Sequence, residues 1–109
     1  MKRFLLAAAI GAAACGCTNQ SAGTEYKVYG YGTQSCGAWT KDADATKSIG
    51  AFAKEAWLLG FISGAGWAGH SMRETDLEGL VAAMNKHCEQ FPTDSIAKAA
   101  AAVATLLER

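Results

Sequence analysis

The positions of four cysteines constrain this 109-residue chain more than any other feature. Cys15 and Cys17 end an N-terminal segment, which leaves Cys36 and Cys88 as the only pair further along the chain. Two such thiols usually form a disulfide in an oxidising compartment. Closing a loop of this length stabilises a fold by roughly 4 kcal/mol, because the unfolded chain loses entropy. We therefore expect a Cys36–Cys88 disulfide rather than a free catalytic cysteine.

The first 17 residues indicate the compartment. Residues 1–3 are a basic start, residues 4–14 are an uncharged run of 11 residues, and small residues lead into the first cysteine. This order is typical of a cleaved export signal. The run is too short to span a bilayer, which takes about 20 apolar residues. We expect an exported protein of the periplasm.

Two cysteines compete to be a lipid attachment site. Cys15 and Cys17 each follow small residues, as the lipidated cysteine of a bacterial lipoprotein does, although neither has the favoured Leu three positions earlier. A plain signal cleavage after Ala14 is the alternative. We expect lipidation at Cys15 or Cys17, and the absence of Asp after either one favours anchoring in the outer membrane. The chain would then contact the membrane through this N-terminal lipid anchor.

The charge balance argues against nucleic acid as a partner. Removing Lys2 and Arg3 leaves eight basic side chains against ten acidic ones, a formal charge near −2. No basic patch remains that could neutralise phosphates. The rest of the chain is the size of one small domain, for which a hydrophobic core alone gives marginal stability. The expected disulfide would supply the missing stability.

The chain divides into an export signal (1–17), a tether and extended arm (18–34) and one helical domain (35–109). Residues 18–25 are small and polar, as in flexible tethers. Residues 26–32 mix β-favouring side chains with glycines, but no second strand candidate follows. The sequence predicts an extended arm there and a loop over residues 33–44.

The longest predicted helix covers about residues 45–69. Gly60 and Gly64 lie one turn apart in it, and each costs up to about 1 kcal/mol of helix stability relative to Ala. This cost predicts close packing of a neighbouring helix against both glycines. The C-terminal half is apolar almost all round, which is typical of a buried helix. The stripe predicted to face the core is Ile49, Phe52, Ala53, Ala56, Gly60, Ser63, Gly64 and Trp67.

Two further helices complete the prediction. One begins after a cap at Thr75 or Asp76 and reaches about Cys88, since residues before Pro92 avoid the helical conformation. The other follows caps at residues 93–95. The fold class is therefore all-α, a compact three-helix domain with an N-terminal arm and one disulfide. The predicted inward positions are Leu77, Leu80, Val81, Met84 and Cys88, then Ile96, Ala99, Ala100, Val103, Leu106 and Leu107.

We find no catalytic constellation, so we expect a protein that is not an enzyme and takes no cofactor. Ser63 lies in a glycine-rich segment, but on a predicted helix rather than on the strand-to-helix turn of a nucleophile elbow. The acidic residues Glu74, Asp76 and Glu78 cluster where a helix begins, and negative charge is favourable there.

The histidines and tryptophans have ordinary structural explanations. His70 and His87 lie near predicted helix C-termini, where they interact favourably with the helix dipole, and their spacing does not resemble a zinc site. Trp39, Trp57 and Trp67 are expected mainly in the core. An exposed tryptophan would be a natural anchor for a protein partner. The sequence pattern does not indicate which of the three tryptophans is exposed.

Three segments together resemble a family of small, mostly uncharacterised proteobacterial exported proteins. They are SCGAW at 35–39, WLLGFISG at 57–64 and MNKHCEQFPTDSIAKAA at 84–100. The family pattern is an early S-C-G-x-W, a helix with W-x-x-G-[FY]-[IL]-S-G, and a late C-x-x-x-P before an alanine-rich helix. The resemblance covers residues 35–107.

More distantly, the chain is similar to HdeA-type periplasmic acid-stress chaperones and to periplasmic immunity proteins that neutralise type VI secretion amidases. Both resemblances imply a helical domain whose disulfide corresponds to Cys36 and Cys88. The function we expect is a non-enzymatic cell-envelope binding protein with a protein partner, of the immunity or inhibitor type. The alternatives are an HdeA-like acid-stress chaperone and a structural envelope lipoprotein.

Overall fold

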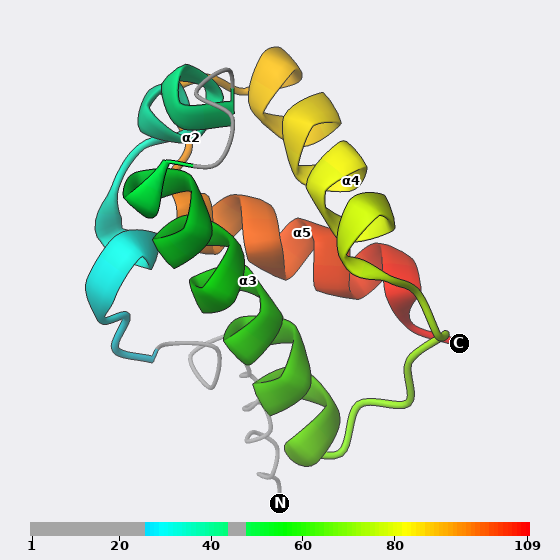
Figure 1. Cartoon of the computed structure of the whole chain (residues 1–109). Coiled ribbons are helices and arrows are strands. Elements are labelled where there is room, and N and C mark those ends of the chain that lie inside the picture. Colours follow the sequence, from blue (N-terminus) through cyan, green and yellow to red (C-terminus); the bar gives the residue numbers. More distant parts are fainter. Residues whose placement is uncertain (1–25, 44–47) are drawn as a thin grey trace, which may run out of the picture.

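The computed structural model describes residues 26–43 and 48–109, and this part of the chain is helical (Figure 1). The expected all-α class with one disulfide is confirmed. The expectations for the export signal, the tether and lipidation at Cys15 or Cys17 lie outside the described residues. The elements are η3 (Gly30–Thr33, a 3-10 helix), α2 (Cys36–Ala43), α3 (Ile49–Trp67), α4 (Leu77–Gln90) and α5 (Ile96–Leu107).

The prediction of a loop over residues 33–44 is wrong, because α2 forms there as a fourth helix. The backbone N–H groups of Ala38 and Trp39 donate to the Ser35 carbonyl at 2.9 and 3.2 Å, which starts the helix. A helix of 8 residues is marginal by itself. Burial of Cys36 and Trp39, which are 0% and 3% exposed, stabilises it instead.

Side-chain caps fix where the three longer helices begin. Ser48 Oγ accepts from the Ala51 N–H at 3.0 Å, and Asp76 Oδ1 accepts from the Gly79 N–H at 2.8 Å. Ser95 Oγ accepts from Lys98 N–H at 3.0 Å. Each cap satisfies a backbone donor that the first helical turn leaves unpaired. The predicted caps Asp76 and Ser95 are thereby confirmed.

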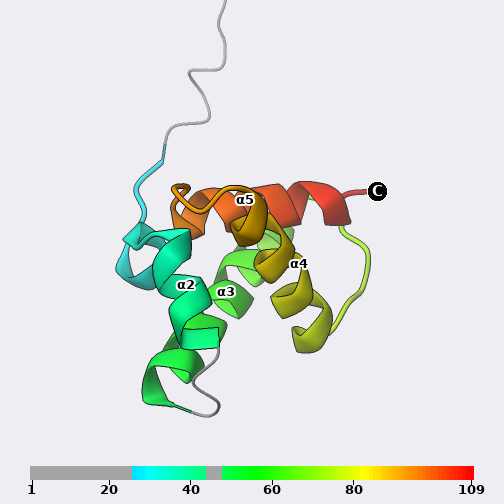
Figure 2. The ribbon, with the colours of Figure 1, turned by 90° about the horizontal axis from the view of Figure 1, so that it is seen from above.

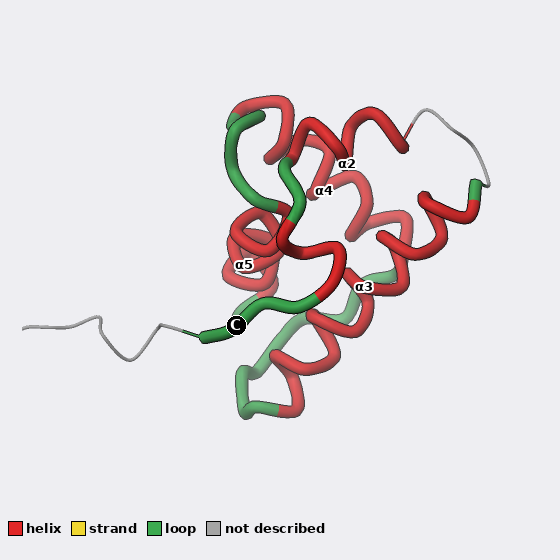
Figure 3. Tube along the Cα trace, turned by 90° about the vertical axis from the view of Figure 1, so that its left-hand side faces the viewer, coloured by secondary structure: helices red, strands yellow, loops and turns green. Residues whose placement is uncertain are grey.

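The core lies where α5 crosses the other helices (Figures 1 and 2). The inward positions predicted for α4 and α5 are buried or partly buried, apart from Leu106, which is 68% exposed. Figure 3 shows the long connection between α3 and α4. It is tied to the end of the chain, since the Arg73 N–H donates to the Leu107 carbonyl at 2.7 Å. The buried core residues are Cys36, Trp39, Leu58, Leu80, Met84, Cys88, Ile96, Ala99, Ala100 and Val103.

The side of α3 that faces the core is not the predicted one. Ile49 and Trp67, which were expected inside, are 87% and 91% exposed. Leu58, on the opposite side, is fully buried, and Phe61 and Ile62 pack beside it. Apolar side chains occur all round this helix, so their periodicity could not select the buried side.

Among the helices of residues 26–43 and 48–109, none combines the length and the apolar character that crossing a membrane requires.

Candidate functional site

An open groove runs between the N-terminal arm, α3 and α5. Its volume is about 790 Å³, within the range of sites that bind small molecules. Residues 26–29 form one edge, α3 contributes positions between Ala56 and Ala65, and α5 contributes Ala101, Ala104 and Thr105. The C-caps of these two helices, Ala68 and Glu108, also line the groove. The groove is therefore built from three segments that are far apart in the sequence.

Aromatic side chains form one wall of the groove. The rings of Trp57 and Phe61 stack with centroids 5.3 Å apart, and the Tyr26 ring lies 6.5 Å from that of Phe61. Trp57 Nε1 donates to the Tyr29 carbonyl at 2.7 Å, which fixes the arm against α3. Gly32 packs so closely on the Trp57 ring that a Cβ there would overlap it. The wall thus depends on the fit between the arm and one tryptophan.

Small residues of α3 line the groove where close helix packing was expected. A Cβ built on Gly60 or Gly64 would meet nothing within 4 Å, so the prediction that a neighbouring helix packs on both glycines is wrong within this chain. Both glycines are exposed and line the groove with Ala56 and Ala68. The prediction failed because α3 turns its other side to the core.

The polar groups of the groove lie at its edges. His70 Nδ1 and Glu108 Oε2 are 2.9 Å apart, and both side chains are about half exposed. Lys27 and Thr105 also line the groove and are exposed. The groove is an apolar trough with a few polar groups at its margin, which is the usual composition of a binding site.

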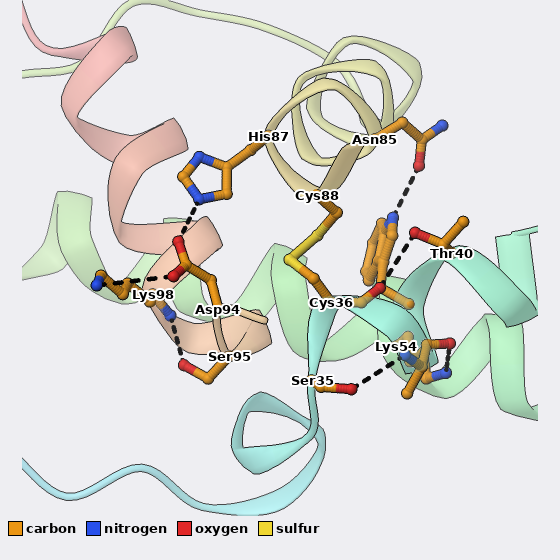
Figure 4. The surroundings of a disulfide bond; sticks show 12 residues. Ser35, Cys36, Thr40, Lys54, Asn85, His87, Cys88, Asp94, Ser95 and Lys98 are labelled. Atoms are coloured by element: carbon orange, nitrogen blue, oxygen red, sulfur yellow. Dashed lines mark hydrogen bonds and ion pairs between the residues drawn. A yellow bond between two sulfur atoms is a disulfide. The ribbon is translucent and has the colours of Figure 1, made fainter. Parts of the chain in front are cut away.

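The expected disulfide joins α2 to α4 in the core (Figure 4). Cys36 and Cys88 are 0% and 1% exposed. The Cys36 N–H donates to the Asp94 carbonyl at 2.8 Å, and Trp39 Nε1 donates to Asn85 Oδ1 at 2.8 Å. The disulfide is therefore a structural bond surrounded by satisfied polar groups, away from the groove.

A second cluster of titratable side chains lies at the junction of α4 and α5 (Figure 4). His87 Nε2 is 2.9 Å from Asp94 Oδ2, and Lys98 Nζ is 3.7 Å from Asp94 Oδ1. The hydrogen bond with His87 is the main cause that lowers the pKa of the Asp94 carboxyl below its usual 3.8, and the nearby Lys98 charge adds to it. The cluster holds the connection 91–95 against the end of α4.

The remaining candidate catalytic and metal-binding residues do not form a common site. Ser63 is exposed on α3, His70 lies after α3, and His87 lies in the last turn of α4. Asp76 caps α4. Within the part of the chain that the structure describes, no group of three or more His, Cys, Asp or Glu residues could hold a metal ion.

Lys54 is a buried charged residue whose burial the sequence did not predict. Lys54 is only 3% exposed, and its Nζ donates to the Ala38 carbonyl at 2.7 Å. The ammonium also lies 5.8 Å from the centroid of the Tyr31 ring. Lys54 therefore links α3 to both α2 and the arm. Its position on the side of α3 opposite to the predicted inward stripe indicated an exposed residue, so no pattern in the sequence pointed to its burial.

Fold and groove define a small, disulfide-linked, all-helical domain with an apolar trough. The chain matches no protein-family model, no curated protein and no solved structure.

Proposed function

We propose that this chain is a non-enzymatic binding protein of the cell envelope, and that its groove receives an apolar segment of a protein partner. The groove itself is the observation that carries the proposal. It offers the aromatic anchors Tyr26, Trp57 and Phe61 beside a floor of small side chains. Aromatic side chains of this kind contribute most of the binding energy at many protein interfaces.

The titratable groups support binding rather than catalysis. Five titratable side chains line the groove, and all five are exposed: Tyr26, Lys27, Tyr29, His70 and Glu108. Catalytic acids and bases usually act in a site from which water is largely excluded. These exposed groups therefore fit a role in orienting a partner.

An envelope location is part of the same proposal. A disulfide between two buried cysteines is the kind of bond that forms and persists in oxidising compartments. Together with the N-terminal pattern of an export signal, it supports a periplasmic protein. Lipidation at Cys15 or Cys17 would hold the domain at the outer membrane. An immunity or inhibitor protein in that place would bind proteins that enter the envelope.

Site-specific photocrosslinking in the native envelope tests the groove. A photoreactive amino acid would replace Thr105, which lines the groove, or Thr40, which lies outside it on α2. The two positions are matched, because both are exposed and both hydroxyls donate to the carbonyl four residues earlier. We expect a discrete crosslinked protein from position 105 alone, and its loss on Phe61→Glu. Equal crosslinking from both positions would contradict the proposal, as would hydrolysis of a cell-wall substrate that disappears on Ser63→Ala.

The acid-stress chaperone stays a second candidate because of one observation. Ile49, Phe52 and Trp67 are exposed on one side of α3, and a holdase needs apolar surface. This candidate predicts suppression of client aggregation at pH 2 to 3. Failure to suppress aggregation there would remove it and leave the groove proposal intact.

A further inference from the structure

One side of α3, which we call the α3 face, is exposed and carries no charge. It consists of Ile49, Phe52, Ala56, Gly60, Ser63 and Trp67. Ile49 is 87%, Phe52 64% and Trp67 91% exposed. Single exposed apolar residues are ordinary on proteins, but three large ones on one uncharged helix side mark an interaction surface.

The area of this face suits association between copies. Trp67 is 91% and Phe52 64% exposed, so together they expose roughly 230 to 390 Å² if a whole aromatic side chain offers about 150 to 250 Å². A stable interface buries about 800 Å² on each partner. These two residues would thus supply between about a quarter and a half of that area. The rest of the face adds further area. Ile49 lies beside Phe52, and the small residues, with the backbone at Gly60, lie between Phe52 and Trp67.

The order of large and small side chains fits a second copy of the same helix. Small residues in the middle of a helix face let two backbones approach closely. Trp67 lies seven residues beyond Gly60, or about 10 Å along the helix. In an antiparallel pair that crosses near Gly60, this distance places Trp67 of one copy beside Ala53 and Phe52 of the other. The large residues at each end would then cover one another.

We propose that the α3 face is a homodimer interface in which two α3 helices pack antiparallel about a two-fold axis. Such an interface uses the same patch on both copies, and an uncharged patch meets its own image without like-charge repulsion. A lipid surface is a poorer match, since helices that lie on membranes carry basic residues on their polar side. The one basic residue of α3 is Lys54, and it is buried.

This proposal does not depend on the proposed function. Ile49, Phe52, Ser63 and Trp67 do not line the groove, whereas Ala56 and Gly60 belong to both surfaces. Substitutions at the first four residues therefore test the dimer without changing the lining of the groove.

Sedimentation velocity of the full chain across about 1 to 100 μM tests the dimer. Ser63→Arg places a charge inside the proposed interface, and Ser71→Arg makes the same change at an exposed position in the connection between α3 and α4. We expect a reversible monomer–dimer equilibrium in the wild type and in Ser71→Arg. We expect its dissociation constant to rise at least about 100-fold in Ser63→Arg, because an unpaired charge would be buried. Thermal unfolding at the lowest concentration shows whether both variants fold.

A wild type that stays monomeric throughout this range would overturn the proposal. Undiminished dimerisation of folded Ser63→Arg would overturn it as well, and so would a monomer that instead binds vesicles of anionic phospholipid through Trp67.

A double-mutant cycle with Phe52→Ala and Trp67→Ala tests the antiparallel arrangement. The two residues lie 15 positions apart, about 22 Å along one helix, so they cannot contact each other within one copy. If they meet across the dimer, each variant weakens dimerisation and the two effects are not additive. We expect a coupling of about fivefold or more in the dissociation constant. Strict additivity would overturn the arrangement.

Discussion

Asp94 connects three parts of the molecule through one residue. Its backbone carbonyl accepts from the Cys36 N–H, while its carboxylate pairs with His87 and with Lys98. The side chains of Asp94 and His87 are each 18% exposed, so solvent screens this pair less than a surface pair. Asp94 therefore contacts α2 through its backbone, and α4 and α5 through its carboxylate.

The lowered pKa of Asp94 determines the sign of its pH effect. A carboxyl whose pKa is lower in the folded protein than in the unfolded chain favours the folded state above the unfolded pKa. This contribution is lost as the pH falls from about 3.8 through the lower folded value. His87→Ala should raise the pKa of Asp94 toward its ordinary value and shift acid unfolding to higher pH. NMR titration of the Asp94 carboxyl and circular dichroism would measure both.

His70→Ala is the matched control for this prediction. His70 pairs with Glu108 at the groove and does not contact Asp94, so the titration of Asp94 should not change. Identical titration curves for Asp94 in the two variants would show that His87 is not the cause of the lowered pKa.

Two glycines near the arm should respond oppositely to alanine. At Gly32 a Cβ would overlap the Trp57 ring, whereas at Gly37 its nearest neighbour would be Ser35 Oγ at 3.5 Å. We expect Gly32→Ala to cost about 1 to 3 kcal/mol, as other overpacked positions do. Gly37→Ala lies in α2 and should be neutral or stabilising by about 0.5 kcal/mol. Urea unfolding of both variants measures the difference, and equal stabilities would refute the tight fit at Gly32.

Among the elements, α4 and α5 could be predicted from the sequence, whereas α2 and the orientation of α3 could not. In α4 one side is apolar and the other carries Glu78, Lys86 and Glu89, which are exposed. In α3 apolar residues occur on every side, so the sequence contains no contrast that selects the inward one. The short helix α2 depends on contacts with distant residues, which local propensity does not contain.

Alanine at Gly60 and Gly64 tests the orientation of α3. Neither position has a neighbour within 4 Å that a Cβ would meet. Each substitution should therefore stabilise the monomer by about 0.5 to 1 kcal/mol, since Ala favours helices more than Gly does. Chemical unfolding at low protein concentration measures this without a contribution from self-association.

Gly79→Ala in α4 is the comparison, because a Cβ there would approach Thr75 Oγ1 to 2.6 Å. It should give a smaller gain than Gly60→Ala. A loss of more than about 1 kcal/mol at Gly60 or Gly64 would instead indicate the close helix packing that the sequence suggested.

At the scale of the whole molecule, the disulfide is the main restraint on the unfolded chain. It joins residues 52 positions apart and connects α2 to α4. Replacing both cysteines by serine should reduce the free energy of unfolding by roughly 4 kcal/mol, within the 2 to 5 kcal/mol typical of small secreted domains. Urea unfolding of the double variant and of the reduced wild type should give similar midpoints. A double variant as stable as the oxidised wild type would refute this role.

The disulfide could be predicted from the sequence, whereas the set of residues that line the groove could not. The cysteine pair could be predicted by counting, because only two candidates lie outside the N-terminal segment. By contrast, the groove forms only when the arm, α3 and α5 pack together, which brings Tyr26, Phe61 and Thr105 into its lining. No local pattern in any of these segments indicates the other two, so the groove had to come from the three-dimensional arrangement.

The three tryptophans occupy three different environments. Trp39 is buried beside the disulfide, Trp57 is half-buried in the groove wall, and Trp67 is almost fully exposed on the α3 face. Indole emission depends on contact with water, so each residue is an intrinsic optical reporter of a different region. Chains that keep a single tryptophan, with phenylalanine at the other two positions, would separate the signals. Core unfolding, groove occupancy and self-association could then be followed by fluorescence without an attached dye.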